Sequence, residues 1–478
     1  MKYTGQKLIM LAGLFVLVSG ISSYAQHASH TVIKGGSQVI ISKSANNNFR
    51  VEYDGDIEVT VDDKDIRSIS DNGYIEISKT VFGNNLYILI EEQGGGLYRE
   101  YRDGRVKMDW EPKGREWLAE ILPDIVRSTT IAAQSRVDRY FRQGGTESVL
   151  GEIRRLEGDY VRAHYFDLLL KKSGLTGNDL ARIAEAAGNE VDSDYYLSKI
   201  LKDNRGLFFR YPLSKTAYLR AAANIDSDHY ASEIFIHALK NKDLNGEDVE
   251  AILEAAQEIN SDHYLSNILK ATLVQDNLTD QMINAIIHTS EEINSDHYQS
   301  ELYKELLQHK PLSQAAYRAI LDAVGDISSD HYLTEILTLL LDENEMTDAL
   351  VDEIANLVED EVSSDHYAAT ILTEMLERDL SDAAFKSIMG SVGEISSDHY
   401  TSEILKQVSK RQLSKGELLS YLQAVREISS DHYASEVLVA IAGQVKGADA
   451  EVRDAYDEAA EGISSDTYLG RVMRAVRD

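Results

Sequence analysis

The sequence predicts a mainly α protein, an α-solenoid of helix-turn-helix repeats of about 34 residues preceded by a small antiparallel β domain. A motif typified by "ISSDHY", which begins at Ile327, recurs about every 34 residues. Between its copies, apolar residues stand three and four positions apart, as in amphipathic helices. Residues 31–108 instead alternate apolar and polar residues around Asp-Gly and Asn-Gly pairs, which is typical of β-hairpins.

The first residues have the features of a cleavable signal peptide. Lys2 and Lys7 precede the apolar run "LIMLAGLFVLVSG", and Ser23 and Ala25 are the small residues that a signal peptidase prefers. We therefore predict a signal peptide over residues 1–25, cleavage after Ala25, and a periplasmic or secreted location. An uncleaved membrane anchor is the alternative, but the run is shorter than the ~20 residues that span a bilayer. No second run of this kind occurs in the sequence, so we expect no membrane span after cleavage.

Composition limits the classes of partner. The chain has 80 acidic and 48 basic residues and a formal net charge of −32. Such a charge repels nucleic acid and anionic lipid, so we expect neither as a partner. A basic protein or peptide suits it, as does a plain need for solubility. The absence of cysteine excludes disulfides and thiolate metal sites, and no cofactor is expected.

The hydrophobic period changes near Gly114, and this change divides the chain. We predict a small antiparallel β domain of six to eight strands over residues 26–112, connecting or capping helices over 113–157, and a solenoid of nine to ten repeats over 158–478. The turn "DDKD" at Asp62–Asp65 offers carboxylates to calcium. It lacks the Gly and the distal Glu of a calcium loop, so we interpret it as a polar turn.

The motif is predicted to begin the second helix of each repeat. Ser328 would be the N-cap of that helix, with Ile327 and Tyr332 around it as a hydrophobic staple. The motif aspartate would be the second helical residue, where it meets the positive end of the helix dipole. The nine motif aspartates are Asp194, Asp228, Asp262, Asp296, Asp330, Asp365, Asp398, Asp431 and Asp466. The residues equivalent to Ser328 are Asp192, Asp226, Asn260, Asn294, Ser363, Ser396, Ser429 and Ser464.

The first helix of each repeat is predicted to begin at a cap of its own, directly after an apolar residue. These caps are Thr176, Ser214, Asn245, Thr279, Ser313, Thr347, Ser381 and Ser414. The last repeat, "GADAEVRDAYDEAAEGI", fits this pattern poorly, as end repeats often do.

Ser, Asp and His side by side invite a catalytic interpretation, which the pattern does not favour. A catalytic triad needs three groups that converge on one point, whereas consecutive residues at a helix start point in different directions. Packed helices lie about 8–10 Å apart, too far for neighbouring histidines to share an ion at bond lengths near 2 Å. We therefore predict no catalytic residue, no metal site and no enzymatic activity.

Two interpretations of the motif histidines remain open. Each histidine packs or hydrogen-bonds against the next repeat, for example with its motif aspartate, or the Asp-His pairs form a stripe that binds a partner. The stripe consists of Asp228, His229, Asp262, His263, Asp296, His297, Asp330, His331, Asp365, His366, Asp398, His399, Asp431 and His432.

Tandem helix pairs of this length resemble α-solenoids of the HEAT and tetratricopeptide classes, although the Trp/Leu-Gly/Tyr pattern and closing Pro of the latter are missing. The phrase "ISSDHYLTEIL" is similar to the I-x-S-D-x-Y repeats of uncharacterised bacterial secreted proteins. Some of those resemble membrane metallopeptidases of the antibiotic-sensor type, but this sequence has no His-Glu-x-x-His segment. The resemblance covers about residues 50–478 and assigns no activity to any residue.

The expected function is a non-enzymatic periplasmic or secreted scaffold that binds a protein or peptide partner along the solenoid surface. Solenoids commonly bind other macromolecules along an extended face. The alternatives are a glycan-binding structural component of the envelope and a hydrolytic enzyme of the envelope.

Overall fold

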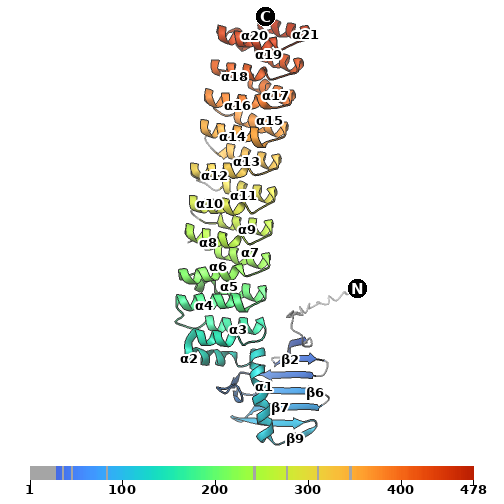
Figure 1. The fold of residues 1–478 in the computed structure, drawn as a ribbon, viewed down its shortest axis with the longest axis vertical. Coiled ribbons are helices and arrows are strands. Elements are labelled where there is room, and N and C mark those ends of the chain that lie inside the picture. The colour runs from blue at the N-terminus through green and yellow to red at the C-terminus, as the bar shows by residue number, and fades with distance from the viewer. Residues whose placement is uncertain are drawn as a thin grey trace, which may run out of the picture. The chain divides into compact units, whose positions relative to one another are not determined.

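The fold is mainly helical, with an antiparallel sheet first and a helical repeat array after it, and this confirms the predicted class. The chain divides into two compact units, residues 1–171 and 172–478 (Figure 1). The predicted signal peptide and its cleavage site after Ala25 lie outside the described residues. The structure, a computed structural model, describes residues 28–34, 37–44, 47–81, 84–240, 244–275, 278–308, 312–343 and 347–477.

The first unit contains a seven-stranded antiparallel sheet and a separate two-stranded hairpin. The sheet order is β1-β2-β3-β6-β7-β8-β9, and β4 pairs with β5. Nine strands therefore lie within the described residues, more than the six to eight predicted. The strands are β1 (Ala28–Lys34), β2 (Ser37–Ser44), β3 (Asn47–Asp54), β4 (Ile57–Val59), β5 (Ile66–Ile69), β6 (Tyr74–Val81), β7 (Asn84–Gln93), β8 (Gly96–Asp103) and β9 (Val106–Met108).

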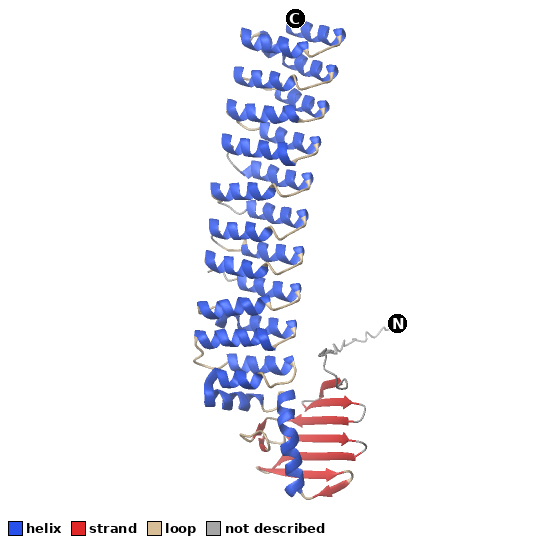
Figure 2. Cartoon of the chain, viewed as in Figure 1, coloured by secondary structure: helices blue, strands red, loops and turns tan. Residues whose placement is uncertain are grey.

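Helix α1 (Arg115–Ser128) covers one face of the seven-stranded sheet (Figure 2). Successive strand residues point to opposite faces, so Ile75 and Ile77 of β6 face the core together. Leu118 and Leu122 of α1 join the same core, and all four side chains are fully buried. A short helical turn, η1 (Trp110–Gly114), leads into α1.

Helices α2 (Ala133–Ile153) and α3 (Asp159–Leu170) complete the first unit. We predicted that the solenoid begins at residue 158, but residues 158–171 group with the sheet instead. A buried arginine explains this difference, because Arg136 of α2 donates a hydrogen bond to the hydroxyl of Tyr165 in α3.

Arg136 also ties the β4–β5 turn to the helices. Its guanidinium donates to Asp63 Oδ2 from Nε at 3.2 Å and from Nη2 at 3.0 Å, and to Glu152 Oε1 at 2.5 Å. Arg139 donates to Asp63 Oδ1 at 2.7 Å. Burial opposes the charged form of Arg136, but Tyr165 and the two carboxylates outweigh it and raise the pKa of Arg136. Arginines therefore neutralise Asp63 and also Asp65, whereas Asp62 accepts a hydrogen bond from Thr60, so the turn is a polar turn held by protein side chains.

The second unit consists of tandem helical hairpins, with a first helix and a second helix in each repeat. With the exception of the α12–α14 pair, whose contacts are few, each helix packs against its equivalent in the next repeat, and first and second helices form two layers (Figure 1). The first helices are α4 (Gly177–Glu190), α6 (Pro212–Ala223), α8 (Gly246–Ala256), α10 (Asp280–Ser290), α12 (Gln314–Val324), α14 (Asp348–Glu361), α16 (Asp382–Glu394), α18 (Lys415–Val425) and α20 (Ala450–Glu461). The second helices are α5 (Asp194–Phe208), α7 (Asp228–Leu239), α9 (Asp262–Thr272), α11 (Asp296–Gln308), α13 (Asp330–Glu343), α15 (Asp365–Leu376), α17 (Asp398–Val408), α19 (Asp431–Lys446) and α21 (Asp466–Arg477).

Side-chain caps begin most of the first helices. Seven of the eight predicted caps are confirmed, since each accepts a hydrogen bond from the backbone amide three residues further on. The prediction for Ser214 is wrong, because α6 begins earlier, at Pro212, a residue favoured at the first helical position. Ser214 is buried inside α6 and donates to the carbonyl of Phe208 at 2.5 Å. Asp449 caps α20, so the last repeat follows the common pattern after all.

No helix among the described residues has both the length and the hydrophobicity that a membrane span requires.

Candidate functional site

The repeated motif begins the second helix of each repeat, but one residue later than predicted. Each of these helices starts at its motif aspartate, and where the N-cap is described, that position is held by the serine directly before the aspartate, whose side chain makes no cap hydrogen bond. The predicted caps, Ser328 and its equivalents, therefore precede the true caps. The aspartate is the first helical residue and not the second, and Tyr332 is the third and not the fourth, so the predicted staple is also out of register.

The motif aspartate joins one repeat to the next. Asp398 accepts hydrogen bonds from the backbone amides of Ser429 at 3.1 Å and Ser430 at 2.8 Å, in the loop of the following repeat. Carboxylates of six further motif aspartates bond the equivalent loop, namely Asp194, Asp228, Asp262, Asp330, Asp365 and Asp431. The carboxylate thus satisfies backbone donors of its neighbour, which is an architectural role.

The motif histidines and tyrosines form one continuous row of ring contacts. His229 lies 5.2 Å from Tyr230 and 5.8 Å from Tyr264 of the next repeat, measured between ring centroids. Tyr195 holds the histidine position in the first repeat and contacts Tyr230 at 6.2 Å. We call the set the His/Tyr row: Tyr195, Tyr196, His229, Tyr230, His263, Tyr264, His297, Tyr298, His331, Tyr332, His366, Tyr367, His399, Tyr400, His432, Tyr433 and Tyr468.

This row confirms that the motif histidines pack against the next repeat, with tyrosine as the partner. The same rings remain open to solvent. All seven motif histidines are exposed, and the tyrosines that follow them are half-buried. The side chain of His331 is 56% exposed and that of His432 is 49% exposed. Every residue of the predicted stripe therefore lies along one edge of the array, and partner binding by that edge stays a prediction.

Carboxylates accompany the row. An exposed acid stands directly before the motif Ile or Val in six consecutive repeats, at Glu258, Glu292, Asp326, Glu361, Glu394 and Glu427. Further acids stand four residues after the histidine, on the same helix face. Nε2 of His331 lies 3.7 Å from Glu335, and Nε2 of His432 lies 3.7 Å from Glu436. The sequence interpretation missed these acids, although their recurrence at a constant offset from the motif was visible.

Lysines of the preceding repeat pair with some of these acids. Lys304 lies 2.9 Å from Glu335, and Lys406 lies 3.2 Å from Glu436. Such exposed pairs contribute little stability, typically about 0.2–1 kcal/mol. Among the acids before the motif, Glu361 and Glu394 are the last residues of α14 and α16, and the other four lie on the loop that follows a first helix. Together they give this edge its acidic character.

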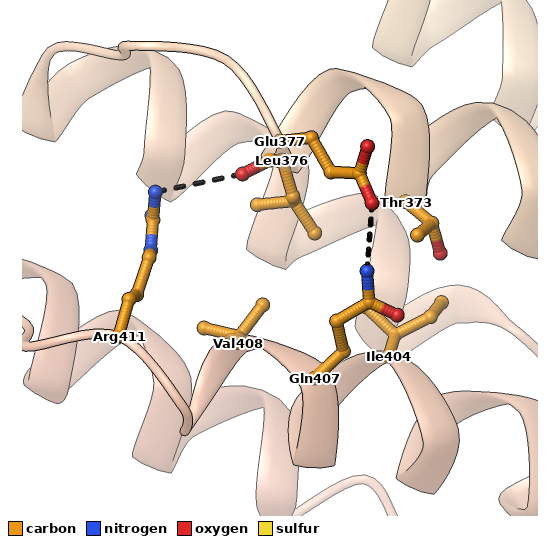
Figure 3. A pocket seen from close by; sticks show the side chains of 7 residues that line it. All are labelled: Thr373, Leu376, Glu377, Ile404, Gln407, Val408 and Arg411. Atoms are coloured by element: carbon orange, nitrogen blue, oxygen red, sulfur yellow. Dashed lines mark hydrogen bonds between the residues drawn. The ribbon is translucent and has the colours of Figure 1, made fainter.

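A cavity of about 390 Å³ lies between α15 and α17, apart from the motif (Figure 3). Gln407 donates to Glu377 Oε1 at 2.8 Å across it, and Arg411 donates to the carbonyl of Leu376 at 3.5 Å. Thr373, Ile404 and Val408 complete its lining. These polar groups join two consecutive repeats. Elsewhere too, the described residues contain no group of three His, Asp or Glu side chains placed to hold a metal ion.

No protein-family model and no curated protein matches the chain. The chain is similar to a solved structure described as "Computational Design of Self-Assembling Cyclic Protein Homooligomers", with 12% identity, a TM-score of 0.12, and coverage of 66% of this chain and 92% of that chain. It is also similar to one described as a "Circular tandem repeat protein with novel repeat topology and enhanced subunit contact surfaces", with 13% identity, a TM-score of 0.14, and coverage of 77% and 78%.

Proposed function

We propose that this chain is an exported, non-enzymatic repeat scaffold that binds a protein or peptide partner along the His/Tyr row. One observation carries the proposal: exposed histidine rings alternate with half-buried tyrosine rings in an unbroken row along the helical array. Aromatic side chains are enriched at protein interfaces, because they bury a large area for little loss of side-chain entropy. A stack of repeats multiplies one such contact along an extended surface.

The geometry of the motif supports a non-enzymatic role. Asp398 uses both carboxylate oxygens on backbone amides of the next repeat, and the serine before it occupies the N-cap position of the helix. A nucleophile would need a general base within hydrogen-bond reach and a third group to orient that base. Export rests on the sequence of residues 1–25, and mass spectrometry of the mature chain tests it, with Gln26 expected as the first residue.

A capture experiment tests binding by the row. The full chain is immobilised and exposed to envelope extract beside a triple variant, His297→Ala/His331→Ala/His366→Ala. His288→Ala is the matched control, because His288 is 72% exposed and lies outside the row. We expect a protein that the wild type and the control capture and the triple variant loses. Equal capture by the triple variant overturns the proposal, and capture of saccharide without protein favours the glycan-binding alternative.

A further inference from the structure

The His/Tyr row repeats its geometry closely from one repeat to the next. Between His263 and His399, the distance from each histidine ring to the following tyrosine is 5.2–5.3 Å. The distance to the next repeat's tyrosine is 5.7–6.1 Å. A partner that uses several repeats at once must therefore present its own side chains at a constant step.

That step corresponds to three residues of extended polypeptide. Packed helices are spaced about 8–10 Å apart. Extended chain rises about 3.3 Å per residue and polyproline II chain about 3.1 Å, so three residues advance about 9–10 Å. A helix also returns to the same face after seven residues, but a helical partner buries an apolar stripe about 100° wide. Exposed acids stand directly before the motif, and partly exposed acids, not apolar residues, stand four residues after His331 and His432. They offer no surface for the apolar stripe of a helix, so we expect an extended chain.

The chemistry of each step suits arginine. One repeat offers an exposed histidine ring, a tyrosine ring, and a carboxylate on the loop, as at His331, Tyr332 and Asp326. A planar guanidinium stacks on aromatic rings and donates two parallel hydrogen bonds to a carboxylate. The formal net charge of −32 also favours encounter with a basic segment.

We infer that the partner presents an extended basic segment in which an arginine at every third residue meets one repeat of the His/Tyr row. This inference rests on the proposed function and names the class of partner. Its occupant is a peptide chain from another protein, bound in register with the array.

Spacing isomers of a synthetic peptide test the register. Dye-labelled peptides of about fifteen residues each carry three arginines, and in two of them the arginines stand at every third or at every second position of a Gly/Ser/Thr background. A third peptide places arginine at every seventh position of a helix-forming background. Fluorescence anisotropy near 0.15 M ionic strength measures binding to the full chain, where remote charges are screened beyond about 8 Å. We expect the every-third peptide to bind about tenfold more tightly than either of the others, a difference of about 1.4 kcal/mol.

Two variants of equal charge separate the row from the general acidity of the chain. Glu292→Gln/Asp326→Asn/Glu361→Gln removes three exposed carboxylates that stand directly before the motif Ile or Val. The matched control, Glu247→Gln/Asp352→Asn/Asp379→Asn, removes three exposed carboxylates outside the motif loops, in or just before first helices. All six side chains are exposed, and thermal unfolding checks that both variants fold. We expect only the row variant to lose about tenfold in affinity and to lose its spacing preference.

Equal binding of the spacing isomers, or equal effects of the two variants, overturns the inference. Tightest binding of the helical peptide overturns it in favour of a helical partner. A different result overturns the proposed function, namely equal capture by the wild type and the triple histidine variant. If the triple histidine variant loses a captured protein while the spacing isomers bind alike, the scaffold function stands and the extended basic segment does not.

Discussion

The substitution Asp398→Ala tests the link between consecutive repeats. Asp398 is half-buried and accepts hydrogen bonds from the backbone amides of Ser429 and Ser430, 31 and 32 residues further along the chain. Alanine removes both acceptors and leaves the two donors to water. Because the amides belong to the next repeat, the expected loss falls on the interface between repeats and not on the helix itself.

The magnitude follows from the two bonds. Hydrogen bonds to a charged group contribute about 1.5–3 kcal/mol each when buried. The motif loop is partly exposed, so water replaces part of this, and we expect a total loss of about 2 kcal/mol. Asp466→Ala is the matched control, because Asp466 occupies the same first helical position in the last repeat but is exposed. It reports the helix-dipole contribution alone, about 0.3–1 kcal/mol.

Hydrogen exchange of the two serine amides is the direct assay. A loss of about 2 kcal/mol corresponds to exchange roughly 30-fold faster at Ser429 and Ser430 in Asp398→Ala. Urea unfolding followed by circular dichroism measures the same loss in the array. The reasoning is refuted if the two amides keep their wild-type protection, or if Asp466→Ala destabilises the array as much as Asp398→Ala does.

Three further predictions use the same unfolding assay. Arg136→Met removes the fully buried cation that Asp63 and Glu152 share and leaves each carboxylate with one other arginine, Arg139 or Arg127, so we expect a cost of about 3 kcal/mol. Arg154→Met, in an exposed pair, is expected to cost less than about 1 kcal/mol, and similar losses in the two variants contradict the buried network. Thr347→Ala removes a side-chain cap and is expected to lower the free energy of unfolding by about 1 kcal/mol. Ser328→Ala, at the residue before an N-cap, is expected to change it by no more than about 0.5 kcal/mol. A larger loss for Ser328→Ala than for Thr347→Ala would support the cap assignment made from the sequence. Burial and, to a smaller extent, the charge of Arg205 lower the pKa of His237 in the folded chain. The unfolded chain therefore binds a proton at His237 at higher pH than the folded chain, and the free energy of unfolding falls as the pH drops below about 6.5. His237→Asn is expected to flatten this pH dependence, and an unchanged slope refutes the prediction.

The repeat array was predictable from the sequence because its signal is local and multiplied. Each repeat carries two amphipathic segments, and nine copies of the motif average out the exceptions. Ser214 shows how a single local signal fails. Serine after an apolar residue is a good cap candidate, yet Pro212 two residues earlier starts the helix and leaves the serine inside it.

The one-residue error at the motif has a different origin. Ser328 and Ser329 are both cap-type residues, so local chemistry cannot distinguish them. A contact between repeats accompanies the observed register, since Asp330, as the first helical residue, accepts hydrogen bonds from the amides of Ser363 and Ser364. The first unit adds a long-range case of the same kind. Arg136 lies in an amphipathic helical pattern, where arginine usually faces solvent, but its partner Asp63 is 73 residues away.

The two interpretations of the motif histidines describe one arrangement. A histidine that packed only inside the array would be buried, and one that served only a partner would make no contact with the next repeat. His331 is compatible with both interpretations, since its ring contacts Tyr332 and Tyr367 while 56% of its side chain stays exposed. The spacing of any bound partner is consequently set by the contacts that hold the repeats together. A partner that spans several repeats must then stabilise the interfaces it crosses, since binding to the folded array alone raises its stability by mass action.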